Sequence, residues 1–219
     1  EPANFGNSGT DPVWGTCPAQ QLIDGDFFVE SNGTVKCTNA SENDTGVLNG
    51  ITYTKRSNAQ ITPANASSTC TSGITEMKSL FRDSTSFNSN INSWDMSSVT
   101  NISYMFYNAE SFNHGLSAWN VSNVDSMRYT FAFADVFNQD IGSWDVSNVT
   151  NMDYMFRDAI AFNQDVSSWD VSSVTKMRAL FFNATAFNHN LSGWCVSLIS
   201  SEPANFGNSG TDPVWGTCP

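Results

Sequence analysis

The chain has 219 residues, of which 40% are apolar, enough for a hydrophobic core, and only 14% are charged. Acidic residues outnumber basic ones by 21 to nine, and the net charge of −12 argues against binding to nucleic acids or anionic membranes, since both need clusters of Lys and Arg. No apolar run approaches the ~18 residues of a membrane span. Abundant Asn, Ser and Thr favour a secreted or surface protein over a cytosolic enzyme. The first residue, Glu1, favours a processed product or part of a longer chain.

The two ends of the chain share one sequence, because residues 1–18 recur unchanged as residues 202–219. Eighteen consecutive identities exclude chance, so we interpret the chain as one 201-residue tandem unit followed by the start of the next. The alternative is that the duplication only reflects how the ends of the chain were chosen. Pro and Gly predict an extended linker in both places, with residues 201–219 leading into a next unit.

Residues 19–75 lack any repeat and predict a small β-rich cap. Runs that favour strands occur at Asp26–Val29 and Gly50–Lys55, with Gly turns between them. A polar segment between Cys37 and Cys70 suggests closure by a disulfide. A cap of this kind shields the open end of a stack of repeats, which otherwise exposes apolar side chains and strand edges.

The cysteine count also fits a tandem unit. Five cysteines are an awkward number for a secreted protein, but one period holds four, because Cys218 repeats Cys17. We predict a disulfide Cys37–Cys70 inside the cap and a disulfide Cys195–Cys218 that clamps the linker to the last repeat. Cys17 is then left to pair with the preceding unit's equivalent of Cys195.

Five copies of a 25-residue repeat fill residues 76–200 without an insertion. One Trp, two Phe and one Asn keep the same position in every copy. These positions are Trp94, Trp119, Trp144, Trp169 and Trp194; Phe81, Phe106, Phe131, Phe156 and Phe181; Phe87, Phe112, Phe137, Phe162 and Phe187; and Asn88, Asn113, Asn138, Asn163 and Asn188.

Within one copy, the spacing of Met152, Met155 and Phe156 predicts a short helix, and the alternation at Trp169 and Val171 predicts a short strand. A single copy cannot bury enough apolar surface to offset the ordering of its backbone. We therefore expect the copies to stack and pair their strands as a solenoid.

The pattern Phe-Asn-Gln-Asp-Ile/Val-Ser-x-Trp-Asp-Val-Ser-x-Val-Thr-x-Met-x-x-Met-Phe resembles the 25-residue repeat of BspA-like leucine-rich-repeat surface proteins, also called mycoplasma-lipoprotein-type repeats. The resemblance covers residues 76–200, and copy three departs from it at Thr130 and Phe133. It implies a secreted or surface-anchored protein without catalysis. It also implies an α/β repeat solenoid, leucine-rich-repeat-like, with five 25-residue coils. With the small disulfide-closed β-rich N-terminal cap and the extended linkers, this is the expected fold.

Asn-x-Ser/Thr sequons are dense and predict N-glycosylation in a eukaryotic secretory pathway. The alternative is compositional, since a chain rich in Asn, Ser and Thr produces sequons by accident. Four of the nine lie in the cap. The candidate sites are Asn32, Asn39, Asn43, Asn65, Asn101, Asn120, Asn148, Asn183 and Asn190.

One column of acidic side chains is a weak candidate for a binding site. Asp95, Asp145 and Asp170 share a register with Asn120 and Cys195. Such a column could bind calcium or a sugar, but we favour a solvated polar row beside the Trp column.

The remaining candidates are weaker. Asp140 and Asp165 form a second possible cation row, and His114 and His189 lie three repeats apart, too far for a shared metal site. No nucleophile–base set, phosphate loop or zinc spacing is present. We expect no metal, no cofactor and no enzymatic activity. We expect the recurrent Asn to form a buried ladder and the Trp column to be core rather than a platform for sugars.

These observations favour an extracellular structural glycoprotein, a unit of a tandem or head-to-tail filament or fibrous surface coat. The expected partners are copies of itself, together with covalent N-glycans. The alternative is a surface adhesin or receptor ectodomain that binds a protein or a glycan through a solenoid face. It requires an exposed apolar or aromatic patch on such a face.

Overall fold

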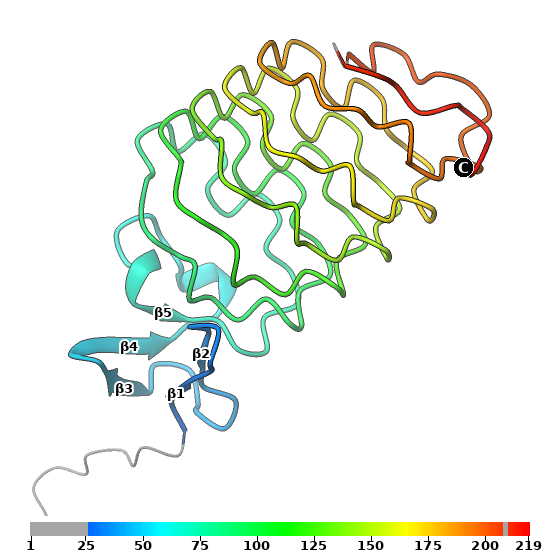
Figure 1. The fold of residues 1–219 in the computed structure, drawn as a ribbon. Coiled ribbons are helices and arrows are strands. Elements are labelled where there is room, and N and C mark those ends of the chain that lie inside the picture. Colours follow the sequence, from blue (N-terminus) through cyan, green and yellow to red (C-terminus); the bar gives the residue numbers. More distant parts are fainter. Residues whose placement is uncertain (1–25, 208–209) are drawn as a thin grey trace, which may run out of the picture.

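A computed structural model describes residues 26–207 and 210–219 and shows an elongated molecule, with a small N-terminal segment at one end and stacked loops of chain beyond it (Figure 1). Two small sheets lie in the N-terminal segment, one of order β1-β2 and one of order β3-β4-β5. The described residues contain no long apolar helix of the kind that crosses a bilayer. The elements are β1 (Phe28–Val29), β2 (Val35–Lys36), β3 (Thr45–Leu48), β4 (Ile51–Lys55), the 3-10 helices η1 (Asn58–Gln60) and η2 (Ala66–Ser68), and β5 (Thr69–Cys70).

The N-terminal segment is held by a hairpin and a disulfide. Strands β3 and β4 pair antiparallel around Asn49 and Gly50, whose positive φ values of 51° and 79° are those of the tight turn that suits an Asn-Gly sequence. Strand β5 pairs parallel to β4, and Cys70 on it is bonded to Cys37. The predicted strand runs and the predicted disulfide are therefore both present.

The expected α/β leucine-rich-repeat-like solenoid is wrong. Residues 76–200, here called the repeat array, contain neither an α-helix nor a strand. Successive copies are joined by backbone hydrogen bonds and pair at isolated parallel bridges, such as Asn101 with Ser126 and Asn151 with Lys176, rather than through strands. Each 25-residue copy forms one loop of tight turns, here called a layer, and the layers lie one over the next (Figure 1).

The expected short helix is absent because its hydrogen bonds alternate between two kinds of partner. The amide of Met155 donates to the carbonyl of Met152 within one turn, whereas the amide of Phe156 donates to Leu180 of the next layer at 2.9 Å. Tyr154 and Asp158 have positive φ values of 62° and 56°, which no α-helix accommodates. The spacing that predicts a helical stripe therefore arises from consecutive turns that point their apolar side chains inward.

The expected strand at Trp169 and Val171 is also replaced by turns. The amide of Trp169 donates to Val166 at 3.1 Å, and the amide of Val174 donates to Val171 at 2.9 Å. Alternation of apolar and polar residues over so few positions suits a turn as well as a strand.

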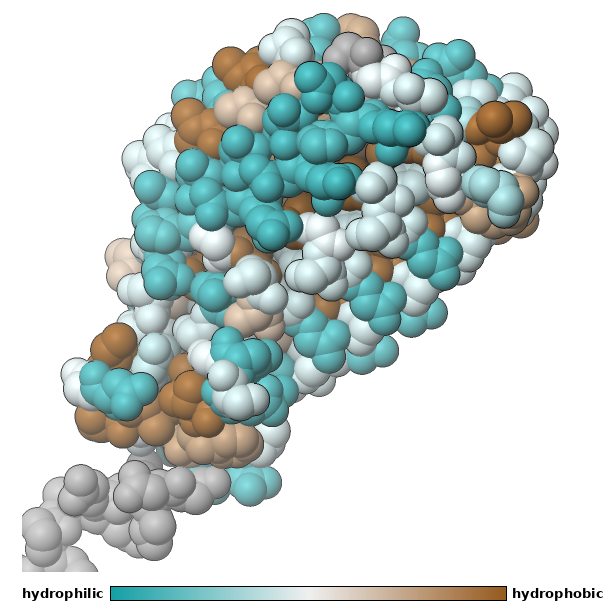
Figure 2. All heavy atoms as spheres, viewed as in Figure 1, coloured by the Kyte–Doolittle hydropathy of each residue, from teal (hydrophilic) through white to brown (hydrophobic). Residues whose placement is uncertain are grey.

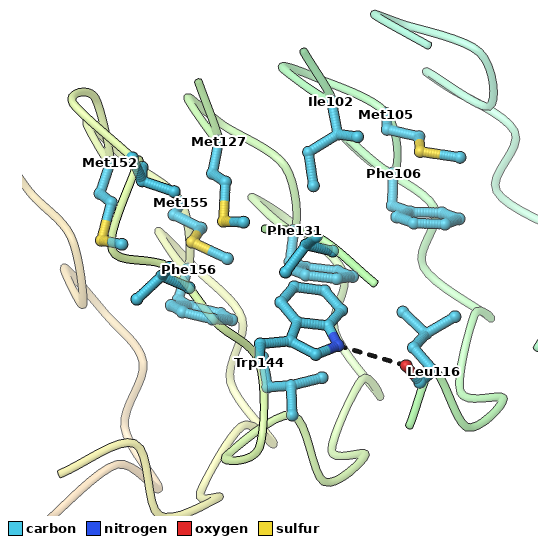
Figure 3. Packing of buried hydrophobic residues seen from close by; sticks show 14 of the residues in the cluster. Ile102, Met105, Phe106, Leu116, Met127, Phe131, Trp144, Met152, Met155 and Phe156 are labelled. Carbon is cyan, nitrogen blue, oxygen red and sulfur yellow. Dashed lines mark hydrogen bonds between the residues drawn. The ribbon is translucent and has the colours of Figure 1, made fainter. Parts of the chain in front are cut away.

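The core consists of columns of aromatic rings that run through the layers. Trp119 and Trp144 stack with 6.2 Å between ring centroids, and Phe106 and Phe131 with 5.4 Å. Each repeat Trp after the first donates from Nε1 to a carbonyl of the layer before it, as Trp144 does to Leu116 at 3.2 Å (Figure 3), and Trp94 donates to Ala66 of the N-terminal segment. The Trp column is therefore core, as the sequence predicts.

Residues 202–219, here called the closing segment, are not an extended linker. Their described part covers the last layer of the array: the amide of Phe181 donates to Phe206 at 2.8 Å, and the amide of Val196 donates to Thr217 at 2.8 Å. The Phe206 side chain is fully buried, and the disulfide Cys195–Cys218 ties the segment down as predicted. The first copy of this sequence, residues 1–18 with Cys17, lies outside the described residues.

Candidate functional site

The residues of the first aspartate column differ in their exposure to solvent. Asp95 is 4% exposed, whereas Asp145 and Asp170 are exposed and each accepts a hydrogen bond from the backbone amide two residues later. Cys195 in the same register is part of a disulfide. The column is therefore a solvated row along most of its length.

Asp95 joins the N-terminal segment to the array. Its carboxylate accepts hydrogen bonds from Lys36 Nζ at 2.7 Å and from Ser72 Oγ at 2.7 Å, and it also binds Ser97. Burial disfavours the charged carboxylate, but these hydrogen bonds outweigh burial and hold the pKa of Asp95 below its ordinary value. The contact is a buried ion pair that fixes one segment against the other.

The second row contains Asp140 and Asp165, both exposed. Hydrogen bonds from Ser167 to Asp165 lower the pKa of that carboxyl group. His189 lies 3.8 Å from Asp165. Across residues 26–207 and 210–219, no three His, Cys, Asp or Glu side chains come together in a way that could hold a metal ion.

The recurrent Asn side chains form a ladder, but an exposed one. Asn113 accepts from the backbone amide of Asn138 at 2.9 Å, and Asn138 accepts from that of Asn163 at 2.9 Å. Asn88, Asn113 and Asn138 are exposed to solvent. The expectation of a buried ladder is wrong, although these residues do satisfy backbone groups of the adjacent layer.

The sequons differ in how their side-chain nitrogen is used. Asn65 and Asn101 are half-buried, and the remaining seven are exposed. Asn65, Asn101, Asn148 and Asn183 donate from Nδ2 to acceptors in the protein at 2.7–3.3 Å, and Asn32 does so at 3.4 Å. The exposed sequons without such a bond in the described chain are Asn39, Asn43, Asn120 and Asn190.

Exposed apolar side chains gather at the two ends of the molecule. The N-terminal segment exposes Phe28 and Val29 on β1 and the hairpin residues Val47, 62% exposed, and Ile51. Figure 2 shows this patch in brown over the cap end. At the opposite end, Leu198 is 57% exposed and Val214 is 64% exposed. Only two other large apolar side chains in the described chain are as exposed: Val136 and Ile160.

A second candidate surface is a stack of three tyrosines on one side of the array. Tyr104 and Tyr129 stack with ring centroids 4.7 Å apart, and Tyr129 and Tyr154 with 4.4 Å. The Arg82 guanidinium lies 5.3 Å from the Tyr104 ring. Further along the stack, that of Arg128 lies 4.9 Å from the Tyr129 ring, and that of Arg178 lies 5.8 Å from the Tyr154 ring. These six residues are here called the tyrosine–arginine column: Arg82, Tyr104, Arg128, Tyr129, Tyr154 and Arg178.

The column has its own electrostatic character. Partial burial, and after it the neighbouring Tyr154 and Tyr104, raise the pKa of Tyr129, so its phenol stays a neutral hydrogen-bond donor at neutral and mildly alkaline pH. Sequence reasoning missed this surface, although the 25-residue spacing of its tyrosines was a visible signal.

A profile of the family described as "Mycoplasma protein of unknown function, DUF285" matches residues 51–144 and, overlapping them, residues 115–211. The matches cover the repeat array and part of the segments on either side. The narrower likeness to BspA-like leucine-rich repeats is not part of this match. No curated protein and no solved structure matches the chain at a significant level.

Proposed function

The chain belongs to the DUF285 family, and from this premise we propose that it is an extracellular structural glycoprotein whose units join end to end in a filament or fibrous surface coat. One observation carries the proposal: the closing segment, which covers the last layer of the array, has the same sequence as residues 1–18. The same sequence therefore covers the last layer of the array as residues 202–219 and precedes the cap as residues 1–18.

The closing segment supplies what the last layer needs. Phe206 is fully buried and contacts Phe181 edge-on, with 5.7 Å between ring centroids, while Trp215 packs against Phe206 at 4.9 Å. The backbone amides of Phe181 and Leu191 find acceptors in the segment. An array without this cover exposes apolar rings and unpaired amides.

Residues 1–18 can make the same contacts only with the last layer of another unit, because this chain's own last layer is already covered by residues 202–219. In a tandem chain, the cover of one array then continues directly into the next cap. The exposed apolar side chains at the two ends of a unit, Leu198 and Val214 at one and Val47 and Ile51 at the other, are suited to such a junction. A contact between two different surfaces builds a filament when the rotation between successive units does not close a ring.

Disulfides and sequons support an extracellular setting. Two disulfides are present in the described residues, and disulfides persist in oxidising compartments. The exposed sequons offer sites for glycans, which add solubility to a surface with few charges.

A chain of two tandem units, expressed through a eukaryotic secretory pathway, tests the proposal. Cryo-electron microscopy is expected to show a rod with a fixed junction, and peptide mapping is expected to show the linking copy of Cys17 bonded to Cys195 of the first unit. Phe206→Asp within the linking copy should make the junction flexible, whereas Val136→Asp, an exposed position on the side of the array, should leave it rigid. Two units on a flexible tether with a free linking cysteine contradict the proposal.

A surface adhesin that binds a protein or glycan through one face of the array is the second candidate. The observation that favours it is the tyrosine–arginine column, an aromatic surface on one side of the layers. Binding of a discrete soluble ligand by single units, without any joining of units, distinguishes it from the structural function.

A further inference from the structure

We propose that the tyrosine–arginine column is a docking surface for a second copy of this chain, which presents its exposed aspartates Asp140, Asp145, Asp165 and Asp170 to it. The contact is side by side. It goes beyond end-to-end joining and does not rest on it, because two single units are enough to form it.

The fold does not require tyrosine in this column. Tyr104, Tyr129 and Tyr154 have φ values of 58–62°, a left-handed conformation that costs most L-residues about 1–2 kcal/mol. The same position in the first and last layers holds Ser79 and Ala179, also with positive φ. The array therefore forms with small residues here, and the three rings call for an explanation other than the backbone.

A neighbouring column shows what the backbone alone selects. The second left-handed position of each layer is Asp or Asn in four of five copies, and these are the residues that adopt this conformation most readily after glycine. They are Asp83, Asn108, Asp158 and Asn183.

The tyrosine–arginine column presents groups that attract anions. The faces of the three rings are covered by one another, by Arg82 at one end and by Arg178 at the other. Stacked sugars thus find no open ring face, and what remains for solvent is ring edges and phenol hydroxyls. Aromatic edges carry the positive side of the ring quadrupole, and phenols and guanidinium groups donate hydrogen bonds.

Arg128, at the centre of the column, has no carboxylate within ion-pair distance in the described chain. In contrast, Arg82 pairs with Asp83 at 3.3 Å and Arg178 with Asp153 at 2.8 Å. A guanidinium stacked on tyrosine rings and left without an acidic partner is well suited to a carboxylate from outside. Most of the basic side chains lie on the same segments of the layers, in a protein whose net charge is −12. Six of the nine are Lys78, Arg82, Arg128, Arg157, Lys176 and Arg178.

The exposed aspartates provide such carboxylates. Asp140 accepts from the Gly142 amide at 2.9 Å and Asp145 from the Ser147 amide at 3.1 Å, in both cases through Oδ1. Within the described residues, neither one's Oδ2 accepts a hydrogen bond. Hydrogen bonds from Ser172 lower the pKa of Asp170, which keeps this carboxylate ionised. None of these carboxylates is in ion-pair distance of the column of its own chain.

The two surfaces have the same pitch, because both come from one 25-residue repeat. Side by side, two copies can place carboxylates opposite the column in successive layers. A single exposed ion pair contributes only about 0–1 kcal/mol. Several pairs on rigid supports add up, since the first contact raises the effective concentration for the next.

Charge reversal and mixing of variants test this docking. The first variant, Arg82→Glu with Arg128→Asp, reverses the column; Asp153 in the register of Arg128 shows that the fold accepts an acid there. The second variant, Asp140→Arg with Asp165→Arg, reverses one aspartate row. Sedimentation velocity of the full chain is expected to show association that weakens about tenfold between ~20 mM and ~500 mM NaCl.

Each variant alone is expected to self-associate about tenfold more weakly or worse. An equimolar mixture of the two should recover the association, since the first variant keeps the aspartates and the second keeps the tyrosine–arginine column. Glu42→Arg with Glu202→Arg, which raises the net charge by the same amount as the second variant but elsewhere on the surface, should associate as the unmodified chain does. Near-ultraviolet circular dichroism checks that each variant folds, and if the first does not, the second and the salt series still decide.

Unmodified chains that stay single at low salt overturn the proposal, as do variants that associate normally or a mixture that fails to recover. A chondroitin sulfate oligosaccharide, titrated by calorimetry, covers the other class of partner. Its binding to the unmodified chain but not to the first variant, without association of copies, also overturns the proposal and assigns the column to a glycan.

Discussion

The N-terminal segment and the repeat array keep their folds by different means. The N-terminal segment has regular strands, a disulfide and a small core of its own around Phe27 and Tyr53. The array has no regular element but a continuous core that takes in Ile61 and Ala66 of the N-terminal segment and runs to Phe206. Regular secondary structure is therefore not what stabilises the larger part of this protein; identical rings stacked at a fixed spacing are.

Removal of one ring from the array should show most directly that stacked rings stabilise it. Phe131→Ala deletes a fully buried ring that contacts Phe106, Phe137 and Phe156, and we expect a loss of about 3–5 kcal/mol in the free energy of unfolding. Denaturant titration measures it. Val136→Ala, at an exposed position, should change the free energy by less than about 0.5 kcal/mol. Equal effects of the two substitutions contradict a core made of stacked rings.

Loss of the Cys37–Cys70 disulfide should act on the N-terminal segment alone. Replacement of both cysteines by Ala is expected to destabilise this segment by about 3 kcal/mol, because its unfolded chain is no longer restrained. Hydrogen exchange should rise around β3 and β4 and stay unchanged at Phe156. Faster exchange throughout the array would instead show that the two regions unfold as one cooperative unit.

The junction between the regions should be sensitive to acid. Asp95→Asn removes the nearer charged partner of Lys36, leaving only Glu30 at 3.8 Å, and is expected to cost about 2 kcal/mol at neutral pH. The pKa of Asp95 is lowered in the folded state, so its contribution is full above the unfolded value of about 3.9 and is lost as the pH falls through the folded value. Stability curves of the two proteins should therefore converge in acid. A gap between them that does not change with pH argues against the ion pair.

The smallest expected effect belongs to the exposed Asn ladder. Asn138→Ala removes an acceptor for the backbone amide of Asn163 and for Gln164, with an expected loss of about 1 kcal/mol. Asn138→Asp keeps an acceptor at the same place and should recover most of the loss in thermal unfolding. If it does not, the amide nitrogen of Asn138 and not its oxygen is what matters.

Much of the architecture was readable from spacing. The 25-residue period of Trp144 and Phe131 with their equivalents predicted stacked copies with a ring core, and the cysteine count predicted both disulfides. The local conformation of each copy could not be predicted from the sequence. Met152 and Phe156 show the same spacing in a helix and in a series of turns, and the choice depends on amides that bond to the next layer.

The sequence by itself determined the period, the identity of the core rings and the repetition of residues 1–18 as residues 202–219, because these are properties of order along the chain. Only the tertiary structure decided that Asp95 is buried while Asp145 is not, that the second copy of the repeated segment covers the array, and that Tyr104, Tyr129 and Tyr154 stack beside arginines. Each of these depends on which residues the layers bring together, and contacts between layers decide it.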